Sequence, residues 1–306
     1  MGVDTIITLI RHAQAEHNVA LDYSIADAPL TELGQRQAAT IPSFTTDIQQ
    51  TIDLIASSGL KRTLSTTRIG LAPAITRLGG LRAVVVLPQL QECNDYPCDT
   101  GSDRAQLEQD PEFNEFNLEH LVPGWNSKQG PYAPDQASLR ARAQWVRQWL
   151  RSRPEKHIAL VAHGDILRYI MSSGPSEYNQ YPWQNAEVRQ FKFDPTRLNA
   201  PECPIVPIHD VGAAGSAEPT SGQIALERQE KQAGAGVGNG ALALPTVELP
   251  SLDFGGGDDF LSEIESRLSE KASAVREREN ELRQLEARLE AAEKRRAELE
   301  ARGITE

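Results

Sequence analysis

The sequence of 306 residues has few cysteines and too little basic charge for several classes of protein. Its three cysteines, Cys93, Cys98 and Cys203, are too few for a disulfide framework and favour a reducing compartment. Lysine and arginine total 31 against 43 acidic residues, and the net charge of −12 argues against a nucleic-acid-binding surface. A small anionic ligand is not excluded, because a few arginines in one pocket can outweigh the overall charge locally.

Long hydrophobic runs are also lacking. No stretch approaches the roughly 18 apolar residues of a membrane span, so we expect no association with a membrane. The apolar run near the N-terminus has no basic segment before it and no small-residue cleavage site after it. We therefore interpret it as a strand and not as a signal peptide, and we expect the protein in the cytoplasm, or in the cytoplasm and the nucleus.

The composition divides the chain into three zones. Residues 1–198 have the mixed, apolar-rich pattern of a globular domain and contain all four tryptophans. Residues 199–257 contain glycine and proline clusters, bury too little apolar surface to offset their ordering entropy, and are predicted to form a flexible linker. Residues 258–302 are rich in Glu, Arg, Ala and Leu, lack proline and are predicted to form one long charged helix.

This C-terminal segment has a heptad pattern, which makes a coiled coil with a second copy or another partner a reasonable expectation. The apolar a and d positions include Leu261, Ile264, Leu268, Leu282, Leu285, Leu289 and Leu299. Lys271 and Arg278 weaken the seam. The alternative is a single helix held by same-chain pairs such as Glu290 with Lys294, each of which contributes only a few tenths of a kcal/mol.

The first zone alternates short apolar runs with helical patterns. The predicted strands are residues 5–10, 53–57, 83–87, 158–162 and 188–193, and the predicted helices are 62–71, 136–152, 165–171 and one that Thr31 caps. This alternation, with continuous apolar strands, predicts a three-layer α/β/α sandwich around a mostly parallel sheet. In such sheets the functional site lies at the carboxyl ends of the strands.

Basic and imidazole side chains follow three of these strand ends. Arg11 and His12 follow the first strand, Arg62 follows the second after a short turn, and His163 follows the fourth. Guanidinium groups match phosphate oxygens in geometry and stay charged. A histidine among arginines has a lowered pKa and therefore stays neutral and nucleophilic. Each residue alone is more often structural, but together they predict a site for a phosphoryl group.

These segments, over residues 4–194, resemble the histidine phosphatase superfamily, which has the phosphoglycerate-mutase-like fold. The matching motifs are Arg11-His12 with Asn18, Leu30-Thr31-Glu32-Leu33-Gly34, Ser58-Gly59-Leu60-Lys61-Arg62-Thr63, Leu90-Gln91-Glu92 and Val161-Ala162-His163-Gly164. Residues 92–103 further resemble a fungal branch of the family whose members also begin Arg-His-Ala-Gln.

The resemblance implies a role for each matching residue. His12 would attack phosphorus, and the phosphoryl group would be bound by Arg11, Asn18, Arg62 and His163. Glu92 would protonate the leaving oxygen and then activate water, which needs a raised pKa. The alternative for Glu92 is a solvated carboxylate. We expect no metal and no cofactor, since Cys93 and Cys98 lack the two further ligands that a metal needs.

One position departs from the family pattern, because Ala13 stands where glycine is commoner. Glycine allows close approach of the backbone to phosphate or a positive φ. The methyl group of Ala13 is harmless if φ is negative and Cβ points away; otherwise it narrows the pocket and puts activity in doubt.

Three functions remain open at this point. We favour hydrolysis of phosphomonoesters over a phosphomutase reaction, because Asp95, Asp99 and Asp103 would repel a second anionic group on the substrate. The third function is a weakly active adaptor that binds a phosphorylated ligand and oligomerises through residues 258–302.

Several aromatic and imidazole side chains have no assigned role. Tyr96, Trp125, Tyr132 and Trp183 either line a pocket or pack in the core. His17 either touches the substrate or lies on the surface. The remaining histidines, His120, His157 and His209, are expected to be structural or solvated.

Overall fold

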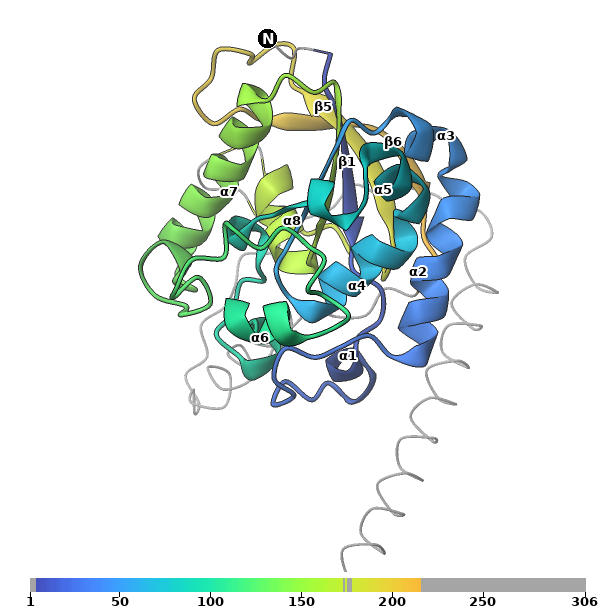
Figure 1. Ribbon diagram of the computed structural model, residues 1–306. Coiled ribbons are helices and arrows are strands. Elements are labelled where there is room, and N and C mark those ends of the chain that lie inside the picture. The colour runs from blue at the N-terminus through green and yellow to red at the C-terminus, as the bar shows by residue number, and fades with distance from the viewer. Residues whose placement is uncertain (1–3, 173, 175–177, 216–306) are drawn as a thin grey trace, which may run out of the picture. The chain divides into compact units, whose positions relative to one another are not determined.

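A computed structural model describes residues 4–172, 174 and 178–215. A six-stranded sheet runs in the order β3-β2-β4-β1-β5-β6 through their centre (Figure 1). Its strands are β1 (Ile6–Arg11), β2 (Leu54–Ser57), β3 (Val85–Val86), β4 (His157–Ala162), β5 (Val188–Phe193) and β6 (Ile205–Gly212). Strands β1 to β4 are parallel neighbours, whereas β5 is antiparallel to both β1 and β6. The mostly parallel sheet is therefore confirmed.

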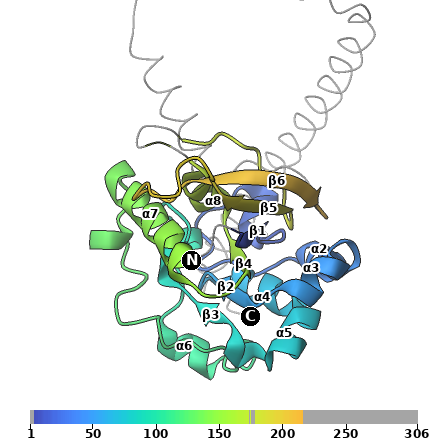
Figure 2. The same cartoon turned by 90° about the horizontal axis from the view of Figure 1, so that it is seen from above.

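Helices cover both faces of the sheet (Figure 2). On one face lie α7 (Gln136–Ser152) and α8 (Gly164–Met171). On the other lie α2 (Glu32–Phe44), α3 (Thr46–Thr51), α4 (Lys61–Gly70) and α5 (Ala72–Leu78). Shorter elements are α1 (Glu16–Ala20), α6 (Arg104–Gln109) and the 3₁₀ turns η1 (Leu81–Ala83), η2 (Pro88–Leu90), η3 (Pro97–Asp99) and η4 (Gly130–Tyr132). The predicted three-layer sandwich is confirmed.

The alternation of side chains along β1 supplies both hydrophobic cores. Ile7 and Leu9 pack with the apolar stripe of α7, whose predicted members Leu139, Ala143, Val146 and Leu150 are all buried. Ile10 points to the other face and packs with residues of α2 and α4. Because burying one such side chain contributes about 1.5–3 kcal/mol, the two cores hold the strand ends in place.

The predicted start of the linker at residue 199 is wrong. Residues 205–212 form β6, which pairs with β5, and Ile205 is buried in the core on the α7 side. Pro207 and the neighbouring glycines hide the strand in the sequence, but proline is tolerated here because β6 is an edge strand. The rest of the predicted linker from residue 216, and the predicted helix 258–302, lie outside the described residues.

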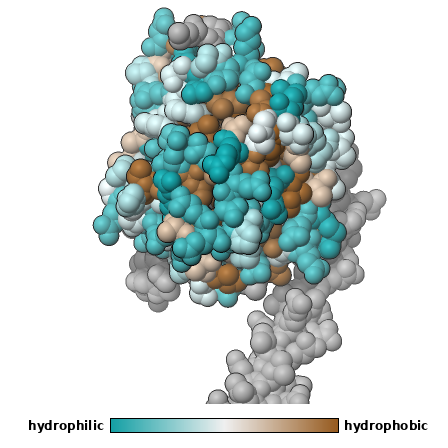
Figure 3. Space-filling model, viewed as in Figure 1, coloured by the Kyte–Doolittle hydropathy of each residue, from teal (hydrophilic) through white to brown (hydrophobic). Residues whose placement is uncertain are grey.

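Within the described ranges, none of the helices combines the length and apolarity that crossing a bilayer requires. The face seen in Figure 3 is covered mainly by hydrophilic side chains, with hydrophobic ones in small separate groups.

Helix α2 is fixed against the loop that follows β1. The Thr31 hydroxyl accepts a hydrogen bond from Gly34 N at 2.9 Å, as an N-cap does, and Thr31 N donates to Gln14 O at 3.1 Å. A Cβ on residue 34 would overlap the backbone carbonyl of Gln14. Glycine at position 34 therefore allows α2 to lie directly against the segment that carries His12.

Replacing Gly34 by alanine is expected to lower the free energy of unfolding by about 1–3 kcal/mol, since the clash is with backbone that cannot rotate away. Chemical denaturation measures this, with Gln35→Ala on an exposed position of α2 as the control. Equal unfolding free energies for the two variants would contradict the close approach.

Candidate active site

His12 follows the last residue of β1, and hydrogen bonds fix both its backbone and the tautomer of its ring. Its N–H donates to Ala162 O at 2.9 Å, and its carbonyl accepts from Ala186 N at 3.1 Å. Its Nδ1 lies 2.7 Å from Ala13 O. A carbonyl oxygen only accepts, so Nδ1 carries the proton and Nε2 keeps its lone pair. That lone pair accepts from Arg62 Nε at 3.3 Å.

The charge state of His12 follows from its surroundings. Burial, followed by the charges of Arg62 and Arg11, holds the pKa of His12 well below its usual value. The imidazole is thus neutral at neutral pH, as a nucleophile must be. The electrostatics expected from the sequence are therefore present, with burial as the larger cause.

Arg62 is held by acidic groups at the start of α4. Asp27 caps the helix, because its Oδ1 accepts from Lys61 N at 3.0 Å. Asp99 pairs with Arg62 Nη2 at 3.1 Å, and both side chains are only 1% exposed. The Cys98 carbonyl accepts from Nη1. These contacts direct the guanidinium toward His12, a role for Asp27 and Asp99 that their sequence does not indicate.

Arg11 and His163 complete the basic cluster. Arg11 is buried at the end of β1 and donates from Nη1 to Trp183 O. The ring of His163 lies 5.2 Å from that of His12, centroid to centroid, and its Nε2 lies 2.9 Å from Ser58 Oγ. Burial, followed by Arg62 and His12, keeps the pKa of His163 well below its usual value. The structure thus brings together the two imidazoles and two guanidinium groups that the sequence singled out.

His17 belongs to the same cluster, although the sequence left its position open. It is buried in α1, and its ring centroid lies 6.1 Å from that of His12. Burial, then Arg62 and Arg11, lowers the pKa of His17 to about 2. Its Nε2 accepts from Asn18 Nδ2 at 3.2 Å, while Asn18 Oδ1 accepts from Ala15 N at 2.9 Å. Asn18 is therefore in place next to the cluster with its amide donor directed at His17.

Glu92 is buried at the N-terminus of α8 and is not a solvated carboxylate. Its Oε1 accepts from Cys93 N and Ile166 N at 2.9 and 3.1 Å, and Oε2 accepts from Asp165 N at 3.3 Å. Burial, followed by the charges of Asp165 and Asp99, raises its pKa to about 7. This provides the partial desolvation that an acid–base role requires.

Two buried cations donate hydrogen bonds to the backbone carbonyl of Glu92. Lys128 Nζ and Arg142 Nη2 both donate to the Glu92 carbonyl, at 2.8 and 3.3 Å. Lys128 has a φ of 55° and a pKa lowered to about 8, with burial as the main cause. Both residues were missed in the sequence, because neither lies within a recognisable motif.

Ala13 fits its position without strain. Its φ is not positive, its side chain is buried among the apolar residues of one core, and its N–H donates to Thr66 Oγ1 at 3.0 Å. The methyl group therefore packs in hydrocarbon, and the main argument for a weakly active adaptor is removed.

The structure corrects the interpretation of the acidic residues after Glu92. Asp99 forms a buried ion pair with Arg62, and Asp103 caps α6. Asp99 is therefore not a free charge that would repel a substrate, whereas Asp95 and Asp103 are exposed carboxylates, so the argument against a mutase rests on those two residues alone. The three cysteines are free and buried, and no group of three or more His, Cys, Asp or Glu within the described ranges is arranged to hold a metal.

The aromatic candidates divide between the core and the periphery. Trp125 and Trp183 are both 1% exposed and pack in the two cores. Tyr96 stacks on Tyr23 with ring centroids 5.4 Å apart, and Tyr132 lines a separate cavity. Of the other histidines, His157 is structural, bridging Thr8 and Thr51, while His120 and His209 are exposed.

The sequence is similar to those of known phosphatases. Residues 7–202 match the sequence model of the histidine phosphatase superfamily (branch 1). A curated relative in Schizosaccharomyces pombe, named as a probable phosphatase, is 27% identical over 209 residues, which cover 65% of this chain and 96% of the relative.

Solved structures with a similar chain include two phosphatases. A phosphoserine phosphatase of Entamoeba histolytica in complex with 3-phosphoglyceric acid is 22% identical, with a TM-score of 0.43, over 68% of this chain and 98% of that one. A mycobacterial glucosyl-3-phosphoglycerate phosphatase is 21% identical, with a TM-score of 0.44, over 68% and 100% of the two chains. The match of the superfamily model to most of the chain shows that this protein belongs to the histidine phosphatase superfamily.

Proposed function

We propose that this phosphatase hydrolyses phosphate monoesters through a phosphohistidine formed at Nε2 of His12. One observation carries the proposal: Nε2 keeps its lone pair because Nδ1 donates to Ala13 O, and this nitrogen faces Arg62 within a cluster of buried basic groups. Arg11, Arg62, His163 and Asn18 would bind the phosphoryl oxygens. Their positive charges and hydrogen-bond donors would stabilise the transition state, in which negative charge is redistributed over those oxygens.

The reaction would proceed in two steps that share one acid–base group. In the first, the Nε2–P bond forms as the P–O bond to the leaving group breaks, and the leaving oxygen takes a proton from Glu92. In the second, water attacks phosphorus, gives a proton to Glu92 and releases inorganic phosphate as the Nε2–P bond breaks. A pKa of about 7 suits both steps, since each form of Glu92 is then well populated near neutral pH.

A phosphomutase would use the same first step. It would differ only in the group that accepts the phosphoryl group in the second step. Hydrolysis is supported by the curated relative, which is named as a probable phosphatase. The adaptor hypothesis rested on a narrowing of the pocket by Ala13, but this side chain packs in the core. Its oligomerising segment, residues 258–302, lies outside the described residues.

Trapping the intermediate tests the proposal directly. Wild-type protein is mixed with radiolabelled phenyl phosphate and a metal chelator, then denatured in alkali, where phosphohistidine is stable. We expect label on the wild type and on His209→Asn, an exposed histidine control, and none on His12→Asn. Label that survives acid, or label on His12→Asn, would exclude phosphohistidine at this position.

A further inference from the structure

His17 lies beside the proposed phosphoryl site, but the two proposed reaction steps give it no role. It belongs to α1, is only 4% exposed, and has its ring centroid 6.1 Å from that of His12. The ring is thus enclosed in the same cluster as the nucleophile. A polar side chain that is buried in this way is expected to have a defined hydrogen-bond partner.

Asn18 is that partner, and the orientation of its amide is fixed. Ala15 N can only donate, so the amide atom that accepts from it at 2.9 Å is Asn18 Oδ1. The nitrogen of the amide, Nδ2, therefore faces His17 Nε2 at 3.2 Å. Because Nδ2 can only donate, Nε2 of His17 accepts, and the proton of the neutral ring lies on Nδ1.

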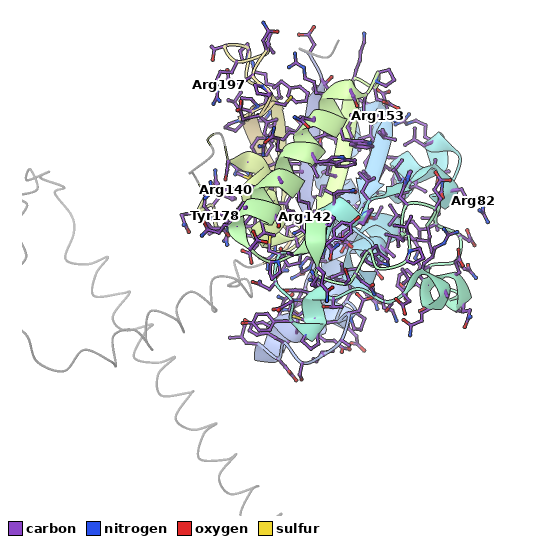
Figure 4. All side chains as sticks on the ribbon, turned by 90° about the vertical axis from the view of Figure 1, so that its left-hand side faces the viewer. Arg82, Arg140, Arg142, Arg153, Tyr178 and Arg197 are labelled. Atoms are coloured by element: carbon purple, nitrogen blue, oxygen red, sulfur yellow. The ribbon has the colours of Figure 1, made fainter. Side chains whose placement is uncertain are left out.

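The charges around His17 keep it an acceptor. Burial, followed by the charges of Arg62 and Arg11, lowers its pKa to about 2. The arginines of α7, of which Figure 4 labels Arg140 and Arg142, are not among the groups that shift this pKa. The two cations that hold His17 neutral are therefore the two that would bind the phosphoryl group, and Nε2 retains its lone pair near neutral pH.

Hydrogen bonds at both ends of the planar Asn18 amide also fix the direction of its remaining donor. The amide nitrogen carries two hydrogens in the plane of the group. One of them points to His17, and the second has no acceptor among the described residues. Without the acceptor on His17 the amide could turn about its last single bond, and the second hydrogen would lose its fixed direction.

We propose that His17 is a positioning residue, whose Nε2 fixes the Asn18 amide so that the second hydrogen of Nδ2 is directed at a phosphoryl oxygen. The proposal rests on the function proposed above, in which Asn18 binds the phosphoryl group. His17 acts on the reaction only through Asn18 and contacts neither the substrate nor the phosphohistidine.

A pair of substitutions in the full chain separates the acceptor from the rest of the ring. His17→Leu removes the acceptor, and we expect kcat/KM for p-nitrophenyl phosphate to fall about tenfold, the effect of losing one hydrogen bond. His17→Gln restores an acceptor, because its Oε1 is as many bonds from Cα as Nε2 of histidine, and it should recover most of the rate. Val19→Ala, at an exposed position of α1, is the control and should have wild-type activity.

A double-mutant cycle shows whether His17 acts through Asn18. Asn18→Ala alone is expected to lower kcat/KM about 10²-fold, because it removes a donor to the transition state. Adding His17→Leu to this variant should cause no further loss, since no amide is left to orient. His17→Phe lacks the acceptor in the same way and takes the place of His17→Leu if that variant does not fold.

Equal losses from His17→Leu with and without Asn18 would overturn the proposal, because His17 would then act on the substrate or on the fold directly. A rate in His17→Gln as low as in His17→Leu would also overturn it. Wild-type activity in Asn18→Ala would remove the role of Asn18, and this proposal with it. The labelling of His12 tests the phosphohistidine separately, because it does not depend on His17.

Discussion

Replacing Glu92 by glutamine is expected to lower kcat for an alkyl phosphate by about 10²- to 10⁴-fold, because the leaving alkoxide then departs without a proton. p-Nitrophenyl phosphate, whose leaving group is a weak base, should lose much less. The buried amide retains the shape of the carboxyl and its carbonyl can still accept from Ile166 N. Asp95→Asn, which changes an exposed carboxylate three residues away, is the matched control.

The pH dependence gives a second readout of the same substitution. In the wild type the carboxyl of Glu92 has a pKa raised to about 7, mainly by burial. The acid form is present below that pH and is lost as the pH rises through it, so kcat/KM should fall above about pH 7. The pKa of His12 is lowered well below its usual value, so its protonation should not limit the rate near neutral pH.

In Glu92→Gln the decline above about pH 7 should disappear. Rates of both substrates measured across this range decide the matter. An unchanged basic limb, or equal losses on the two substrates, would assign the acid–base role to another group.

Removing Arg62 is expected to have separable effects on activity and stability. Arg62→Ala takes away a phosphate-binding charge, and we expect kcat/KM to fall by about 10³-fold. It also leaves Asp99 as a buried carboxylate without its guanidinium partner, at 1% side-chain exposure. Breaking such a pair typically costs about 3–5 kcal/mol of unfolding free energy.

The double variant Arg62→Ala/Asp99→Asn separates these effects. The neutral amide needs no counter-charge, so most of the lost stability should return while activity stays low. Denaturant unfolding and steady-state kinetics measure the two quantities on the same preparations. Recovery of activity in the double variant would show that Arg62 acts only on the fold, and a single variant as stable as wild type would show that the pair contributes little.

The strongest predictions from sequence concerned the sheet and the residues at its strand ends. Residues 188–193 and 136–152 form β5 and α7 with the predicted bounds. In α7 the 3.6-residue period of the apolar positions fixes both the helix and its buried face. Strand β6 was missed, since its proline and the glycines at and after its end resemble a linker and only pairing with β5 stabilises it.

The candidate site likewise contains residues that the sequence predicted and residues that it did not. His12, Arg62 and His163 follow strand ends, so the parallel sheet predicts that they converge, whereas Glu92 was indicated only by the family resemblance. The partners that orient and charge them are Asp27, Asp99, Lys128 and Arg142. These residues come from loops and helices whose sequence has no periodicity or motif to indicate a contact with the site.

The sequence by itself therefore determined the α/β class, the parallel order of the strands and the basic and imidazole groups at their carboxyl ends. Local patterns suffice for these features, because periodicity and turn chemistry act over a few residues. Only the tertiary structure decided the tautomer of His12, the harmless position of Ala13 and the burial of His17. Burial and the placing of charges depend on segments that are distant in the chain, and those distances arise only when the chain folds.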